Sequence, residues 1–156
     1  MDELVKKLIA NNLTIASCES LTGGLFAASL TKVSGVSKVY KGSLITYQND
    51  AKIRLLGLFN EEIGRYGVIS EYTASFMALK TKELLDVDIA LSFTGNAGPD
   101  TLEGKKVGLV YIGICIKDKI KVFECNFNGN RDEIRNQSID FAKKILLDYL
   151  SGKDLI

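Results

Sequence analysis

The sequence predicts an α/β protein, a three-layer α/β/α sandwich with a mixed sheet, in a single domain over residues 1–156. Segments rich in β-branched residues alternate with amphipathic segments, which is typical of a sheet covered by helices on both faces. Residues 87–93 are almost continuously apolar, as expected of a central strand. Because 46% of the 156 residues are hydrophobic and no linker or repeat divides the chain, we expect one core.

The first half of the chain predicts two strands and their flanking helices. Apolar residues at helical spacing mark the helices, and β-branched or aromatic residues mark the strands. In order, we expect a helix at 2–11, a strand at 13–16, a helix at 23–32, a strand at 39–47, short helices at 51–56 and 60–65, and a longer helix at 70–85. Asn49 or Asp50 is expected to cap the first short helix and Gly57 to end it, while Ser70 and Thr73 open the longest one.

The second half predicts a strand, a hairpin and a long terminal helix. The strand at 87–93 is followed by two β-rich segments at 106–116 and 119–127, which flank a two-residue turn at 117–118. Asn130 and Glu133 have the spacing of a capping pair at the start of a helix over 131–150.

Composition excludes several classes of function. The chain has 20 basic and 19 acidic residues, a net charge of +1 and no basic block, so nucleic acid is not an expected partner. It shows no signal peptide and no apolar segment long enough to cross a membrane, so we expect a cytoplasmic protein without a membrane partner. Three scattered cysteines do not form a disulfide framework.

The chain contains no histidine. This absence excludes Ser-His-Asp and Cys-His catalysis within the chain, as well as histidine-based zinc sites. The cysteines lack the spacing of metal ligands, and we expect no metal. Acid–base chemistry at neutral pH must therefore come from lysine, tyrosine, carboxylates or a cysteine with an altered pKa.

Three polar segments follow the predicted strands at 13–16, 39–47 and 87–93. If these strands are parallel, the segments meet at one edge of the sheet, where α/β proteins bind ligands. Ser20 is then a candidate nucleophile, Lys52 its base and Tyr47 a proton relay or orienting group, because a desolvated lysine can lose its proton near neutral pH. The alternative is an exposed helical lysine, a half-buried sheet tyrosine and ordinary turns.

Further residues of these segments are candidates for binding. Backbone amides of Gly23, Gly24 or Gly95 could hold an oxyanion, with a hydroxyl from Thr94. Two arginines at positions 131 and 135 begin the last predicted helix, where cations oppose the helix dipole, so an anionic ligand would explain them. The alternative for each arginine is a solvent-exposed charge.

Several segments, in order along nearly the whole chain, resemble motifs of the CinA C-terminal domain family (competence/damage-inducible protein). Cys18–Gly24 resembles Ala-Glu-Ser-Cys-Thr-Gly-Gly, Tyr47–Lys52 resembles Tyr-Ser-Asn-Glu-Ala-Lys, and Gly67–Glu71 resembles Gly-Ala-Val-Ser-Glu. Thr94–Pro99 resembles Thr-Gly-Ile-Ala-Gly-Pro, Val107–Tyr111 resembles Val-Gly-Thr-Val-Tyr, and Asn128–Arg131 resembles a Gly-Asp-Arg segment.

The resemblance implies nicotinamide mononucleotide deamidase activity, which is hydrolysis of the carboxamide to nicotinic acid mononucleotide and ammonia. It implies a catalytic set of Ser20, Lys52 and Tyr47, no cofactor, and a homo-oligomer. The residues expected to contact the nucleotide are Glu19, Thr22, Gly23, Gly24, Thr94, Gly95 and Arg131, the last of these at its phosphate.

The chain departs from the family pattern mainly after the third predicted strand. Asn96 replaces the usual isoleucine, and the glycine-rich segment that normally follows is absent from residues 100–107. These changes predict a reshaped substrate-facing loop at 96–106. They also motivate two alternatives: a catalytically silent nucleotide-binding or interaction module with a competence or DNA-damage role, and an amidase for a different carboxamide.

Overall fold

Five strands form one mixed sheet in the order β2-β1-β3-β4-β5, in a computed structural model that describes residues 1–153. Strands β1, β2 and β3 are parallel to one another, whereas β4 and β5 are antiparallel to their neighbours. The strands are β1 (Ile15–Glu19), β2 (Tyr40–Ile45), β3 (Ile89–Gly95), β4 (Leu109–Ile116) and β5 (Lys119–Asn126).

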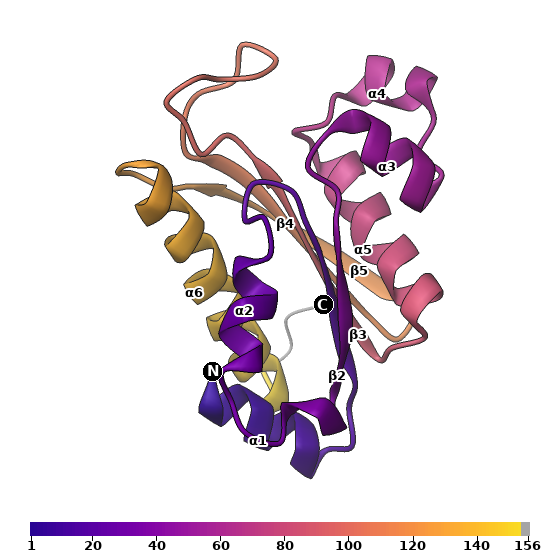
Figure 1. Cartoon of the computed structure of the whole chain (residues 1–156), viewed down its shortest axis with the longest axis vertical. Coiled ribbons are helices and arrows are strands. Elements are labelled where there is room, and N and C mark those ends of the chain that lie inside the picture. Colours follow the sequence, from indigo (N-terminus) through magenta and orange to yellow (C-terminus); the bar gives the residue numbers. More distant parts are fainter. Residues whose placement is uncertain (154–156) are drawn as a thin grey trace.

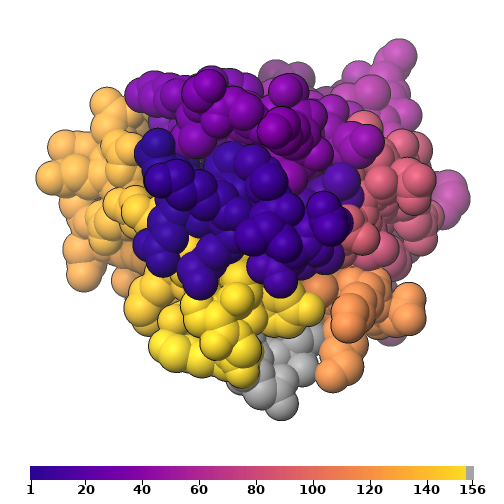
Figure 2. All heavy atoms as spheres, turned by 90° about the horizontal axis from the view of Figure 1, so that it is seen from below, coloured from indigo at the N-terminus to yellow at the C-terminus, as the bar shows by residue number. Residues whose placement is uncertain are grey.

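Helices cover both faces of this sheet, which confirms the predicted three-layer architecture (Figure 1). One layer contains α1 (Asp2–Ala10), α2 (Leu25–Thr31) and α6 (Arg131–Leu150), and the other contains α3 (Asn49–Leu56), α4 (Asn60–Tyr66) and α5 (Glu71–Leu85). A short 3₁₀ helix, η1 (Val36–Lys38), precedes β2. Seen from below, α1 lies against the C-terminal part of α6 (Figure 2). No helix within residues 1–153 is long and apolar enough to span a membrane.

The two faces of the sheet differ in side-chain size. Large apolar side chains of β1, β3 and β4 join α1, α2 and α6 in the main hydrophobic core. The face toward α5 carries small residues instead, among them Ala90, Ser92 and Gly113. A Cβ at Gly113 would lie 2.7 Å from the carbonyl oxygen of Ala74 in α5, so this helix packs unusually close to the sheet.

Most predicted elements are found within a few residues of their expected bounds. The hairpin turns at residues 117–118 as predicted, and the expected caps at Ser70 and Asn130 are present. Strand β1, however, extends through the polar residues to Glu19, and α2 begins only at Leu25. The expected side-chain cap of α3 is absent, because the helix already begins at Asn49. Residues 154–156 of the predicted domain lie outside the described residues.

Candidate active site

The parallel strands bring three chain segments together at one edge of the sheet, as the sequence predicted. Ser20 follows β1, Tyr47 and Lys52 follow β2, and Gly95 is the last residue of β3, before the loop that leads to β4. These segments are far apart in the sequence, and the parallel register of β1 with both neighbours places them side by side. The candidate site is therefore a product of the topology.

Lys52 and Ser20 form a hydrogen-bonded pair. The Lys52 ammonium group, on the first turn of α3, donates to the Ser20 hydroxyl, and Nζ and Oγ are 3.2 Å apart. The lysine is 1% exposed, and this burial lowers its pKa from 10.5 to about 8, an effect that Cys18 partly opposes. A buried amine in contact with a hydroxyl can act as its base once it is neutral.

Tyr47 contributes to this pair through its backbone. Its carbonyl oxygen accepts hydrogen bonds from both Ser20 Oγ and Lys52 Nζ, each at 3.4 Å. The residue is 55% exposed, and its phenol oxygen accepts a 2.7 Å hydrogen bond from Arg131 Nη2. The tyrosine hydroxyl thus contacts the arginine rather than lying between the serine and the lysine, so the geometry favours an orienting role over a proton relay.

A cavity of about 340 Å³ opens beside Ser20. Arg131 lines it, and its Nη1 donates a 2.7 Å hydrogen bond to the carbonyl oxygen of Gly98, which also lies in the wall. The remaining lining residues are Leu21, Tyr47, Gly95, Asn96, Ala97, Pro99, Asp100, Thr101 and Leu102. The nucleophile candidate and a cation therefore share one cavity. Most of the wall comes from the loop after β3, which lies within the substrate-facing loop predicted at 96–106, although none of its residues was predicted as an individual contact.

Glu19 is fully buried and does not line this cavity. Its carboxylate accepts hydrogen bonds from the backbone N–H groups of Gly24, Phe26 and Ala27 at 3.0 to 3.1 Å, and from the Ser17 hydroxyl at 3.1 Å. It therefore satisfies the free amides at the start of α2, where a negative charge is favoured. The structure places Glu19 as a residue that positions α2 beside Ser20.

The expected oxyanion donors of the first segment are already engaged. The Gly24 amide binds Glu19, and the Gly23 amide donates to the Ser20 carbonyl at 3.1 Å. The Thr22 hydroxyl is buried and has no hydrogen-bond partner among the described residues, and this residue neither caps α2 nor lines the cavity. In this arrangement neither glycine amide is free to hold an oxyanion.

Of the two site residues predicted at the end of β3, one lines the cavity and the other does not. The Thr94 hydroxyl donates to the Val68 carbonyl at 2.7 Å, and the residue does not line the cavity. Gly95 lines the cavity, and a Cβ there would lie 2.5 Å from the Leu109 carbonyl oxygen. The glycine is thus required by the close approach of β4, while the threonine ties β3 to the segment before α5.

Arg135 lies one helical turn after Arg131 and binds the protein itself. Its Nε and Nη2 donate to the carbonyl oxygens of Leu21 and Thr22 at 3.1 and 2.9 Å, and its Nη1 pairs with Asp132 at 3.2 Å. The two arginines therefore join α6 to the segments that carry Ser20, Tyr47 and Gly98. Their spacing of four residues at the start of a helix is the sequence signal for this arrangement.

The comparison with known proteins agrees with this fold. The CinA C-terminal domain family matches residues 1–150. The chain belongs to this family. A CinA superfamily protein from Klebsiella pneumoniae has a crystal structure with a TM-score of 0.93 and 26% identity, covering 97% of this chain and 96% of that one. A competence/damage-inducible protein from Agrobacterium tumefaciens gives a TM-score of 0.88 and 32% identity, covering 97% of this chain and 95% of that one.

Two curated relatives are longer than this chain. A competence-damage inducible protein homologue from Bacillus cereus is 45% identical over 141 residues, which is 90% of this chain and 34% of that protein. A homologue from Bacillus mycoides is 44% identical over 139 residues, or 88% of this chain and 34% of that protein. The chain thus spans about a third of the length of these family members.

Proposed function

We propose that this CinA-family protein is an amidohydrolase that converts nicotinamide mononucleotide to nicotinic acid mononucleotide and ammonia. The observation that carries the proposal is the 3.2 Å contact between the buried Lys52 amine and the Ser20 hydroxyl. In a chain without histidine, this pair supplies both a nucleophile and a base. The family resemblance supports the choice of substrate.

The proposed reaction begins when neutral Lys52 accepts the proton of Ser20 as its oxygen attacks the carboxamide carbon. The tetrahedral intermediate then expels ammonia, which receives its proton from the Lys52 ammonium, and leaves an acyl-enzyme. Neutral Lys52 next takes a proton from water, whose oxygen attacks the acyl carbon. The second tetrahedral intermediate releases the acid and expels the Ser20 oxygen, which regains its proton from the Lys52 ammonium. With a pKa of about 8, about a tenth of the lysine is neutral at pH 7.

Arg131 is the proposed phosphate ligand. It lies in the wall of the cavity that Ser20 lines, and two of its five N–H donors are used by Gly98 and Tyr47. The remaining donors suit a phosphate, which guanidinium groups bind in a bidentate manner. The cavity volume of about 340 Å³ is at the small end of ordinary ligand sites.

The direct experiment measures ammonia release from nicotinamide mononucleotide by the wild type and by Ser20→Ala and Lys52→Met. We expect both variants to lose at least about 1000-fold in rate, as is typical when one member of a catalytic pair is removed. Similar rates in all three proteins would contradict the mechanism. Circular dichroism of each variant checks that the fold is retained.

One observation favours a second candidate, a nucleotide-binding module without catalytic activity. The Lys52 amine faces three oxygens, those of the Thr46 carbonyl at 2.6 Å, the Tyr47 carbonyl and the Ser20 hydroxyl. Three acceptors match the three donors of an ammonium ion and favour the protonated lysine. Calorimetric titration that shows binding of nicotinamide mononucleotide, together with no ammonia release at pH 7 or pH 9, would support this candidate.

A further inference from the structure

The loop at residues 96–106, where the chain departs from the family pattern, is held together by hydrogen bonds of one of its own side chains. Asn96 is buried, and its Nδ2 donates to the carbonyl oxygens of Leu102 and Lys105 at 3.2 and 2.9 Å. Its Oδ1 accepts a 3.0 Å hydrogen bond from the Leu102 amide. One side chain therefore holds both ends of the loop together, which the usual isoleucine could not do.

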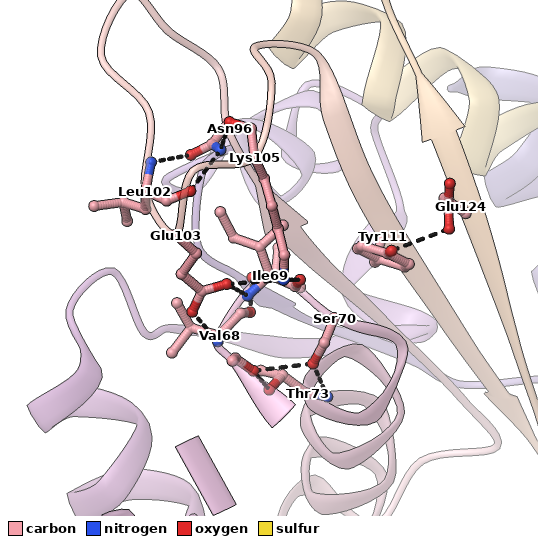
Figure 3. Close-up of polar contacts among 12 residues, drawn as sticks. Val68, Ile69, Ser70, Thr73, Asn96, Leu102, Glu103, Lys105, Tyr111 and Glu124 are labelled. Atoms are coloured by element: carbon pink, nitrogen blue, oxygen red, sulfur yellow. Dashed lines mark hydrogen bonds and ion pairs between the residues drawn. The ribbon is translucent and has the colours of Figure 1, made fainter. Parts of the chain in front are cut away.

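The far end of the loop is fastened to the segment before α5 (Figure 3). The Glu103 carboxylate accepts hydrogen bonds from the backbone amides of Val68 and Ile69, at 2.6 and 3.2 Å. Lys105 Nζ donates to the Ile69 carbonyl oxygen and pairs with Glu103 at 3.0 Å. Each of these two side chains thus reaches from the loop to the same short backbone segment.

The segment that receives these contacts is itself fixed. The Val68 carbonyl accepts a hydrogen bond from the Thr94 hydroxyl, and this bond joins the segment to β3. Gly67 lies so close to the loop that a Cβ there would be 2.7 Å from the Glu103 carboxylate. Burial alone would raise the pKa of Glu103, but the hydrogen bonds from Lys105 and the two amides lower it, so the carboxylate is charged at neutral pH.

We propose that Asn96, Glu103 and Lys105 are positioning residues that hold the loop as a preformed wall of the nucleotide cavity and so determine how tightly the cavity binds its ligand. This inference rests on the proposed function for the identity of that ligand. The loop supplies the cavity residues Ala97, Gly98, Pro99, Asp100, Thr101 and Leu102, and Asn96 itself also lines the cavity. None of the three positioning residues touches Ser20 or Lys52 through a described hydrogen bond.

The physical reason is preorganisation. A loop that is free in solution must lose conformational entropy when it closes on a ligand, and this loss weakens binding. A loop already held by side-chain hydrogen bonds loses little. We therefore expect release of the loop to weaken ligand binding while the chemistry at Ser20 is unchanged.

The test uses two loop variants and a matched control in the full chain. Asn96→Asp replaces the double donor Nδ2 with an oxygen that faces two carbonyls, and Lys105→Gln removes the ammonium from Ile69 and Glu103. Lys106→Gln makes the same change at the next residue, which is exposed and whose side chain has no described polar contact. Backbone hydrogen exchange of residues 97–104 is measured in each protein, and the dissociation constant of nicotinamide mononucleotide is measured calorimetrically in a Ser20→Ala background.

We expect exchange at residues 97–104 to become at least about tenfold faster in both loop variants, and the dissociation constant to rise about tenfold. The control should match the parent protein in both measurements. Unchanged exchange in both loop variants, equally fast exchange in the control, or fast exchange with unchanged affinity would overturn the proposal. If the parent protein does not bind the nucleotide, the proposed function fails, and the exchange data still decide whether these residues hold the loop.

Discussion

Replacement of the buried lysine by an apolar residue of similar length tests the electrostatics of the site without any substrate. In Lys52→Met the side chain keeps its approximate volume in the buried position, but the amine is gone. Two effects then oppose each other at pH 7. Removal of a buried charge stabilises the fold, whereas the carbonyls of Thr46 and Tyr47 lose their donor, at about 1–3 kcal/mol for each group.

The pH dependence separates these two effects, because only the wild type carries the titrating amine. The pKa of Lys52 is about 8 in the folded state and 10.5 ordinarily, so between these values the unfolded chain binds more protons than the folded one. The free energy of unfolding of the wild type therefore rises with pH in this window. Between pH 7 and pH 9.5 the free energy of unfolding of the wild type should rise by about 2 kcal/mol relative to that of Lys52→Met. The whole pKa shift corresponds to about 3 kcal/mol, which a wider pH range would be needed to cover.

The assay is urea denaturation of both proteins at pH 7 and pH 9.5, compared as a double difference so that all other titrating groups cancel. Ser20→Ala is the control, because it keeps the amine and should show the same gain of about 2 kcal/mol as the wild type. A double difference that stays within about 0.5 kcal/mol of zero would refute the argument that burial depresses the pKa of this lysine.

Three other substitutions and one control substitution test how neighbouring elements support the site. Arg135→Lys cannot make the two parallel bonds to Leu21 and Thr22, so ammonia release should fall about tenfold. The control Asp132→Asn, which removes the negative charge of the exposed partner of Arg135, should have the wild-type rate. Glu19→Gln replaces one oxygen of a fully buried carboxylate, which accepts hydrogen bonds from several amides, with an NH₂ donor. Urea denaturation should show that the free energy of unfolding falls by about 2–4 kcal/mol. An unchanged denaturation midpoint would contradict the role of Glu19 in positioning α2. Gly95→Ala places a methyl group 2.5 Å from a β4 carbonyl and should destabilise the fold by about 1–3 kcal/mol, and wild-type stability would show that β3 and β4 can separate there.

The parts of the fold predicted correctly are those specified by local sequence. Asn130 and Glu133 lie three residues apart and cap α6 reciprocally, and the turn at 117–118 follows from the two β-rich segments that flank it. Helix α2 begins two residues later than the sequence predicts, because Gly23 and Gly24 have left-handed backbone conformations. Glu19 caps the helix from the end of the preceding strand. The sequence pattern does not predict this cap, because the hydrogen bonds of Glu19 depend on where the folded chain places the amides after Gly24.

The sequence predicts those parts of the candidate site that follow from the order and direction of the strands. Parallel strands must bring Ser20 and Lys52 to the same edge of the sheet, and a chain without histidine narrows the choice of base. The sequence could not show that Tyr47 meets this pair through its carbonyl, because backbone contacts do not depend on residue type. It also could not show that Asn96 fastens the cavity loop, since its partners are backbone carbonyls whose positions depend on the folded loop.

Covalent labelling tests most directly whether the buried Lys52 amine activates Ser20. A fluorophosphonate reagent reacts with activated serines, and peptide mass spectrometry identifies the labelled residue. Because Lys52 must be neutral to accept the proton, we predict that Ser20 is labelled at a rate that rises with pH around a midpoint near 8, and that this rise is absent in Lys52→Met. Labelling of Ser20 at the same rate in both proteins, or a rate that does not change between pH 6 and pH 9, would contradict this role of Lys52.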